Sequence, residues 1–292
     1  MLLPVSEMTD IINAVHLSGY GSEGTSLRDL RRRVGDQMNL TGRTVVITGG
    51  SRGMGQRLAV RLGAEGARVV VNYKQNADAA NATVKEVIDA GGKAVALQAD
   101  IADMAAVRAL VDGAVEAFGS IDVVVANAAA SAFKPLSGIH PHHVSKTMGI
   151  TVEGFLELVR ASTPHMPHGG RVMAVSGWDS FRVLPGHGLL GAAKAAMEAI
   201  VRYLAIELGP KGITAVGICP GPIDTDSFRY YAGDQWDLYE KNWLSLAPSR
   251  KFPTPDEIAD VMVFFCSPAS AAVNGQTIVV DGGLSLATMP AP

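Results

Sequence analysis

The sequence has few cysteines, few aromatic residues and little net charge, and these shortages exclude whole classes of protein. Of its 292 residues only Cys219 and Cys266 are cysteines, too few and too far apart for a disulfide framework, so we interpret both as reduced core thiols. The net charge of −3 provides no basic field for nucleic acid. The N-terminus lacks a basic segment followed by a long apolar run. The sequence therefore predicts no signal peptide, no membrane span and a cytoplasmic protein.

Three of the seven histidines form a local cluster, which lacks the composition of a metal site. His140, His142 and His143 lie around Pro141, but no carboxylate or cysteine shares their spacing. We interpret the cluster as the start of a helix and expect no bound metal.

The composition that is present favours an α/β protein with an N-terminal extension. The chain is 48% hydrophobic and has 32 glycines, which suits one large domain with many tight turns. Residues 1–41 are polar, with one short helical candidate around 26–37, and we expect them to pack on the core or on a neighbouring subunit. Residues 42–292 are expected to form a single Rossmann-type domain.

Within that domain, short apolar strands alternate with helical segments. Such a pattern indicates a parallel sheet covered on both faces, and seven strands fit a doubly wound Rossmann fold, an α/β class with a seven-stranded parallel sheet flanked by helices. The ligand crevice of this fold lies beyond the C-terminal ends of its strands. The expected strands are 44–47, 68–72, 94–99, 123–126, 171–175, 214–218 and 277–280, and the expected helices are 55–63, 77–90, 104–118, 153–166, 192–208 and 255–266.

A glycine-rich motif follows the first expected strand. The segment Thr48–Gly55 reads TGGSRGMG and leads directly into a helical segment. Gly49 allows a sharp turn, Gly53 lets the backbone approach a diphosphate, and Gly55 permits close packing of helix on sheet. The helix N-terminus adds amide donors and the positive end of the helix dipole. With a strand before it and a helix after it, the motif predicts a dinucleotide site.

Jointly with four later motifs, this loop resembles the short-chain dehydrogenase/reductase family over residues 42–286. Asp100 matches the aspartate that holds the adenine, and Ala126–Ala129 resembles the Asn-Asn-Ala-Gly turn in weakened form. Pro220–Thr225 matches the loop over the nicotinamide, and Asp281–Gly283 the family's terminus. The resemblance implies a cofactor site made of Gly49, Ser51, Arg52, Gly53, Met54, Asn72, Tyr73, Lys74, Asp100, Ile101, Asn127, Ala128, Lys194, Pro220, Gly221, Ile223 and Thr225.

Charge near the end of the second strand favours NADPH over NADH. An acidic residue there would accept a hydrogen bond from a ribose 2′-hydroxyl and repel a 2′-phosphate. This chain has the neutral Asn72 at that position, with Lys74 close by and Arg52 in the glycine loop. Two cations and no carboxylate favour binding of the phosphate.

The catalytic positions match the family only in part, because the chain has no tyrosine between Tyr73 and Tyr203. The resemblance implies that Lys194 is the lysine that holds the nicotinamide ribose. Leu190 stands where the proton-donating tyrosine is expected, four residues before it. Thr151 replaces the expected asparagine, and Gly177 the expected serine, with Ser176 beside it.

His187 offers a substitute for the missing phenol. The enoyl-thioester reductases, a branch of the same family, have their tyrosine seven residues before the lysine, and His187 has that position here. Seven residues at about 100° each return to nearly the same helix face. Histidine can donate a proton near neutral pH. A purely structural or substrate-contacting role for His187 stays open at this stage.

The substrate region is aromatic. Trp178, Asp179 and Phe181 follow the fifth strand, and residues 226–246 contain three of the six tyrosines. These residues indicate a bulky apolar substrate or a packed lid helix, and Tyr230 or Tyr231 is a further candidate for the missing phenol.

The sequence thus predicts an NADPH-dependent reductase of an enoyl or ketone group in a polyketide- or acyl-type substrate, free or carrier-bound. Lys194, His187 and Ser176 are the candidate catalytic residues. Two alternatives stay open: non-redox chemistry such as cyclisation, isomerisation or dehydration, and a catalytically silent partner. The resemblance implies a homotetramer or homodimer.

Overall fold

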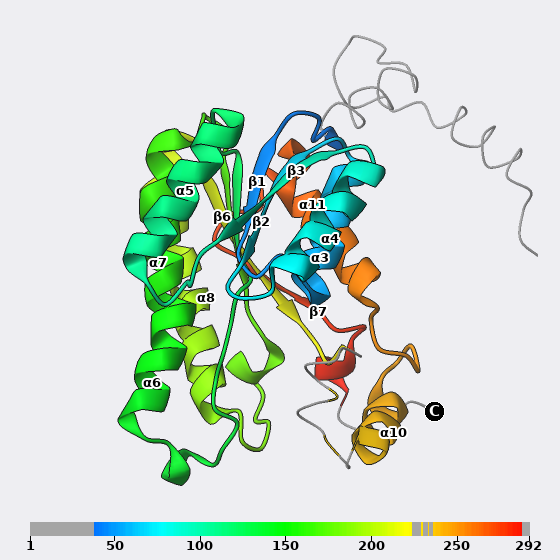
Figure 1. Ribbon diagram of the computed structural model, residues 1–292. Helices are drawn as coiled ribbons and strands as arrows, with labels where there is room; N and C mark the ends of the chain where they lie inside the picture. Colours follow the sequence, from blue (N-terminus) through cyan, green and yellow to red (C-terminus); the bar gives the residue numbers. More distant parts are fainter. Residues whose placement is uncertain (1–37, 224–228, 230–232, 234–235, 288–292) are drawn as a thin grey trace, which may run out of the picture. The chain divides into compact units, whose positions relative to one another are not determined.

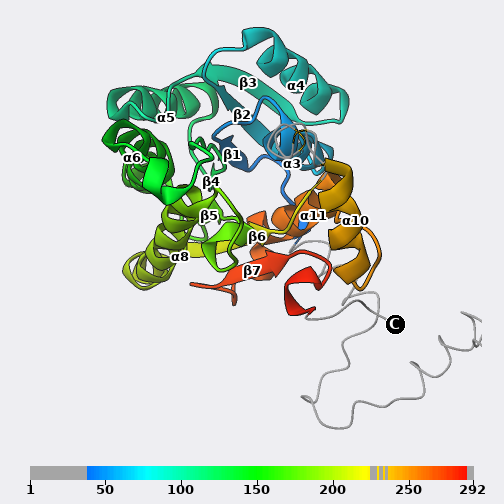
Figure 2. The same ribbon diagram turned by 90° about the horizontal axis from the view of Figure 1, so that it is seen from below.

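Seven parallel strands form the centre of the computed structural model, which describes residues 38–223, 229, 233 and 236–287. The strand order is β3-β2-β1-β4-β5-β6-β7, so the chain turns back at β1 and continues in the other direction from β4 (Figure 2). This order confirms the doubly wound fold. The strands are β1 (Thr44–Ile47), β2 (Arg68–Tyr73), β3 (Lys93–Gln98), β4 (Val123–Ala126), β5 (Arg171–Val175), β6 (Thr214–Pro220) and β7 (Thr277–Val280).

Two layers of helices cover the sheet, one on each face (Figure 1). Because side chains alternate along a strand, Val45, Ile47, Val69 and Val71 point to one face, and Val46 and Val70 to the other. The first face is covered by α3 (Gly53–Ala64), α4 (Ala77–Asp89) and α11 (Pro255–Cys266), and the second by α5 (Met104–Phe118), α7 (Gly154–Ser162) and α8 (Gly188–Leu208).

The remaining helices are short or lie at the ends of the strands. The segment expected as one helix at 153–166 is divided in the structure: Glu153 ends a π-helical turn, α7 follows, and Thr163–His165 form a 3-10 turn. These remaining helices and turns of the described residues are α6 (Pro141–Met148), the π-helical turn η2 (Gly149–Glu153), α10 (Trp236–Leu246) and the 3-10 turns η1 (Leu136–Gly138), η3 (Thr163–His165), η4 (Trp178–Ser180), η5 (Gly209–Lys211), η7 (Pro268–Ser270) and η8 (Leu284–Leu286).

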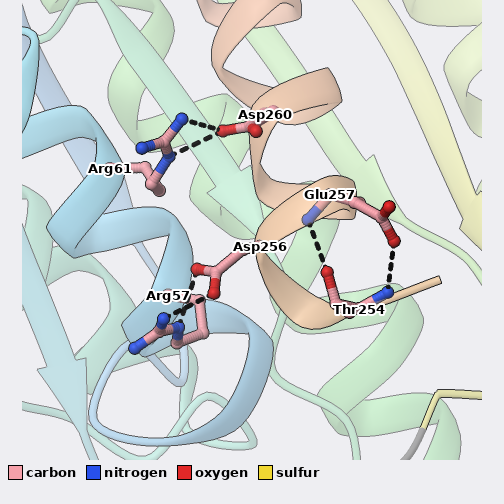
Figure 3. A network of polar contacts seen from close by, with 6 residues as sticks. All are labelled: Arg57, Arg61, Thr254, Asp256, Glu257 and Asp260. Carbon is pink, nitrogen blue, oxygen red and sulfur yellow. Dashed lines mark hydrogen bonds and ion pairs between the residues drawn. The ribbon is translucent and has the colours of Figure 1, made fainter.

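Two ion pairs join α3 to α11, far apart in the sequence. Arg57 donates through Nε and Nη2 to the two carboxylate oxygens of Asp256, at 2.9 and 2.6 Å, and Arg61 pairs with Asp260 one turn further along (Figure 3). The N-terminus of α11 is closed by a capping box, in which the Thr254 hydroxyl accepts from the Glu257 amide and the Glu257 carboxylate accepts from the Thr254 amide (Figure 3). The ion pairs therefore tie the helix that follows the glycine loop to its neighbour.

The expected extension, with its helical candidate around 26–37, lies almost entirely outside the described residues. From Met38 the chain belongs to the Rossmann core, since Leu40 is fully buried in the cluster around β1.

Candidate active site

The glycine loop between β1 and α3 has the shape that a dinucleotide needs. Gly49 and Gly53 have φ values of +64° and +55°, in the left-handed region that favours glycine. A Cβ at Gly55 would overlap the Gly49 carbonyl oxygen, whereas a Cβ at Gly53 would have no heavy atom within 4 Å. Gly55 is thus required by packing, and Gly53 leaves open space at the start of α3.

The N-terminus of α3 fits an anionic group. Arg52 is its N-cap residue and makes no side-chain capping hydrogen bond, so the Arg52 side chain does not satisfy the first-turn amides of Gly53 and Met54. These amides, the helix dipole and the open space at Gly53 together form a cradle for a diphosphate.

Hydrogen bonds of Thr48 and Asn127 join the glycine loop to the turn after β4. The Thr48 hydroxyl accepts hydrogen bonds from the amides of Asn127 and Ala128, each at 3.0 Å. The Asn127 side-chain amide donates to the carbonyl oxygens of Thr48 and Gly49, at 3.0 and 3.1 Å. The weakened ANAA turn therefore keeps the loop in place through its asparagine.

Asn72 is a second brace of the same loop. Its side chain is buried, its Oδ1 accepts from the Gly49 amide at 3.1 Å, and its Nδ2 donates to the Ala99 carbonyl at 3.1 Å. The structure thus gives Asn72 a role inside the protein that the sequence did not indicate. Because the Asn72 side chain is buried and hydrogen-bonded within the protein, its bearing on cofactor choice is that it places no negative charge at the end of β2.

The basic residues beside this loop differ in their surroundings. Lys74 Nζ lies 2.6 Å from Asp100 Oδ2, and this contact is the main cause that lowers the pKa of Asp100. Arg52 is exposed at the start of α3. Ile101 is buried behind Asp100, and Tyr73 is half-buried.

The loop expected over the nicotinamide follows β6 and lies beside the end of β7. The Gly221 amide donates to the Val280 carbonyl at 3.0 Å, and a Cβ at Gly221 would lie 2.5 Å from the Asp281 Cβ. Pro220 and Ile223 belong to the same described segment, whereas Thr225 lies outside the described residues.

Lys194 is buried in the first half of α8. Its Nζ donates to the Val175 carbonyl oxygen at 2.5 Å, and only 5% of the residue is exposed. Burial lowers the pKa of Lys194 to about 8, and the carboxylate of Asp179 partly opposes that shift. The site therefore holds an ammonium group that loses its proton more readily than an ordinary lysine.

The positions at which the sequence predicts departures from the family pattern are all at least half-buried or closely packed. Leu190 is half-buried, and Thr151 is fully buried in the π-helical turn η2. The Thr151 hydroxyl has no hydrogen-bond partner among the described residues. A Cβ at Gly177 would lie 2.6 Å from Asp179 Oδ1, so the place of a serine side chain is occupied by a carboxylate.

His187 lies beside that carboxylate. It is the N-cap residue of α8, which begins at Gly188, and its Nδ1 is 3.1 Å from Asp179 Oδ2. Both side chains are buried, with exposed fractions of 10% and 6%. The ring of Phe133 packs on the imidazole at 4.7 Å between centroids. The sequence had placed Asp179 near the substrate, but it had not connected Asp179 with His187.

Ser176 is engaged by a residue that the sequence had not singled out. Its hydroxyl donates to Glu198 Oε1 at 2.5 Å, and the Ser180 hydroxyl donates to the same oxygen at 2.6 Å. Glu198 lies four residues after Lys194 on α8, so helical spacing could have indicated that the two share a face.

An aromatic group lines the region beyond the strand ends. Trp178 donates through Nε1 to Asp281 Oδ2 at 3.1 Å, and its ring packs edge-on against Trp243 of α10 at 6.4 Å. Tyr239 stacks on Trp243, and Phe252 packs against its edge. Tyr230 and Tyr231 lie outside the described residues.

The arrangement combines a dinucleotide cradle, a buried ammonium and an imidazole–carboxylate pair at one edge of the sheet. Across the described residues, no three histidine, cysteine or acidic side chains are grouped so as to hold a metal ion. No helix in the same part of the chain is long and apolar enough to span a membrane.

Comparison with known proteins finds reductases and dehydrogenases that are similar to this chain in sequence and in fold. The family model for Enoyl-(Acyl carrier protein) reductase matches residues 49–285. The chain is 40% identical to 1-cyclohexenylcarbonyl-CoA reductase of Streptomyces collinus over 84% of its own length and 88% of the relative's. It is 34% identical to versicolorin reductase of Emericella nidulans over 85% and 97%. A short chain dehydrogenase from Burkholderia cenocepacia, solved in complex with NADP, is 33% identical and superposes with a TM-score of 0.79 over 85% and 99%.

Proposed function

We propose a specific reaction for this chain, which belongs to the short-chain dehydrogenase/reductase family and is therefore an NAD(P)H-dependent oxidoreductase. The proposed reaction is the NADPH-dependent reduction of an enoyl C=C bond or a ketone in a bulky apolar, acyl-type substrate. The observation that carries the proposal is one carboxylate shared by two groups: Asp179 Oδ2 lies 3.1 Å from Nδ1 of His187, and the same carboxylate interacts electrostatically with the buried ammonium of Lys194.

His187 is the proposed proton donor. Reduction of a conjugated C=C bond or a ketone adds a hydride to carbon and leaves negative charge on the carbonyl oxygen, and the bound cofactor supplies that hydride. The doubly protonated imidazole of His187 then gives one proton to the enolate or alkoxide. Lys194 holds the nicotinamide ribose and contributes positive charge near the developing anion.

Ser176 is the weaker candidate for this step. Its hydroxyl proton is directed to Glu198 at 2.5 Å, so the hydroxyl is available to the substrate only as an acceptor unless it rotates away. We propose that Ser176 orders Glu198 and the adjoining loop.

NADPH is the proposed cofactor because the end of β2 carries no carboxylate side chain toward solvent. Asn72 is neutral and buried, and Arg52 is exposed at the start of α3. The solved relative from Burkholderia cenocepacia was crystallised with NADP, which supports the same choice.

The proposed substrate is apolar and bulky, free or carrier-bound. The aromatic group around Trp178 and Trp243 offers ring surfaces beside the site. Two relatives point to the same chemistry by their names, one a reductase of a cyclohexenylcarbonyl-CoA and the other a versicolorin reductase.

The test is a turnover assay with a matched histidine variant. Purified protein with NADPH and a panel of cyclic enoyl thioesters, enones and polycyclic ketones is expected to oxidise NADPH with at least one of them. His187→Phe should reduce turnover about 100-fold or more, as expected for loss of a general acid. His165→Phe, which changes a histidine of η3 away from the site, is the control.

Two results would contradict the proposal. Tight NADPH binding without consumption across the panel would favour a non-redox activity, such as isomerisation or dehydration, or a silent partner. Unchanged turnover in His187→Phe would remove His187 from the reaction while leaving reduction itself in place.

A further inference from the structure

Asp179 sits in space that two glycines leave open. A Cβ at Gly177 would lie 2.6 Å from Asp179 Oδ1, and a Cβ at Gly191 would overlap the Asp179 carbonyl oxygen. A serine at position 177 and the observed carboxylate position are therefore incompatible without rearrangement. The observed carboxylate position therefore depends on a residue without a Cβ at position 177.

Other titratable groups near Asp179 and Lys194 are hydrogen-bonded or neutral. On α8, Glu198 accepts from Ser176 and Ser180. After β7, Asp281 accepts from Trp178 and from the amides of Gly283 and Ser285. Cys219 on β6 stays a neutral thiol, because burial raises its pKa to about 12. The carboxylate in contact with the imidazole is that of Asp179.

We propose that Asp179 is a positioning residue that accepts a hydrogen bond from Nδ1–H of His187 and so directs the second proton of the imidazolium, on Nε2, to the substrate. The inference rests on the proposed role of His187. In the step, the Nε2–H bond breaks, a bond forms between that proton and the enolate or alkoxide, and the ring becomes neutral with its remaining proton on Nδ1. The carboxylate stays ionised throughout and stabilises the charged ring before transfer.

Asp179 also interacts electrostatically with Lys194. The experiment therefore has to separate the effect of Asp179 on His187 from its effect on Lys194. Removing the carboxylate would destabilise both the imidazolium and the ammonium, so either route moves the alkaline limb of the rate profile to lower pH. Only the route through His187 requires that residue to be present.

The experiment compares pH–rate profiles of NADPH oxidation between pH 6 and 9.5 for the wild type, Asp179→Asn, His187→Gln and the double variant. Asp179→Asn is expected to slow turnover at pH 7 about 10- to 100-fold and to move the alkaline limb to lower pH. In the His187→Gln background, Asp179→Asn should change the rate by no more than about twofold and should leave the alkaline limb at the same pH, because residues that act as a unit are not additive. Asp112→Asn, an exposed change on α5, is the control.

Several outcomes of the rate measurements would overturn the inference. They include an Asp179→Asn profile lowered uniformly without movement of its limb, a limb shift that persists in the His187→Gln background, and full additivity of the two substitutions. If His187→Gln keeps wild-type turnover, the proposed function loses its proton donor as well, whereas a slow His187→Gln with an unaffected Asp179→Asn overturns only this inference.

A measurement on the wild type covers the case in which Asp179→Asn does not fold. Nitrogen NMR of histidine-labelled protein, with His187→Gln used for assignment, should show the neutral ring of His187 as the Nδ1–H tautomer. The Nε2–H tautomer would overturn the inference.

Discussion

At the scale of single residues, this site shows how a lost side chain can be linked to a gained one. The sequence predicts that Gly177 stands where the family has serine, and the Asp179 carboxylate lies within 2.6 Å of where a Cβ at position 177 would be. It likewise predicts Leu190 in place of the phenol, while His187 lies at the N-cap of the same helix. A side chain at position 177 would therefore require the Asp179 carboxylate to shift from its observed position beside His187.

The cofactor preference is also decided by single residues, and we expect Arg52→Ser to weaken NADPH binding about 10- to 100-fold. Loss of charge-assisted hydrogen bonds to a phosphate accounts for this magnitude. Lys74→Ser should have a smaller effect, because Lys74 is already paired with Asp100 at 2.6 Å. Fluorescence titration measures both affinities.

NADH serves as the matched ligand in that titration, since it lacks the 2′-phosphate. Its affinity should change less than threefold in Arg52→Ser, and Lys85→Ser, an exposed change on α4, should alter neither ligand. Equal losses for NADH and NADPH would contradict the assignment of Arg52 to the phosphate.

At the scale of elements, the helix that follows the glycine loop is held by ion pairs to α11. We expect Asp256→Asn to lower the free energy of unfolding at pH 7 by about 0.5–1 kcal/mol, the range for an exposed pair, and Tm by about 1–4 °C. Thermal unfolding followed by circular dichroism measures the change.

The same pair should depend on pH in a defined direction. Its hydrogen bond with Arg57 lowers the pKa of Asp256 from its usual value of 3.8. The pair thus stabilises the fold above pH 4, and the contribution is lost as the pH falls further and the carboxylate takes up a proton. The difference between Asp256→Asn and the wild type should shrink at pH 3, and an undiminished difference there would exclude the ion pair as its cause.

At the scale of the whole molecule, the parallel order of the sheet brings separate loops to one edge. The glycine loop after β1, the turn after β4, the η4 loop after β5 and the segment after β6 all follow C-terminal ends of strands (Figure 2). This is why residues more than a hundred positions apart, such as Trp178 and Asp281, form one site.

Assembly into an oligomer is the remaining expectation at this scale. Tyr203 and Ile206 on α8 are 71% and 79% exposed, large apolar surfaces that association would cover. We expect the native protein to be a homotetramer or homodimer, and Ile206→Glu to reduce its mass in light scattering after size-exclusion chromatography. Ile88→Glu, an equivalent change at a 52% exposed isoleucine of α4, is the control. A monomeric wild type would contradict the expectation.

The sequence by itself determined the sheet, the glycine loop and Lys194, because these depend on local periodicity and on spacing within one strand–turn–helix unit. Strands 44–47, 123–126, 171–175 and 277–280 have the predicted bounds. Only the tertiary structure decided that Asn72 braces the loop, that Ser176 meets Glu198 and that Asp179 meets His187. Those contacts depend on how the η4 loop lies against α8 and how β2 meets the glycine loop, and such long-range packing leaves no periodic pattern in the residues themselves.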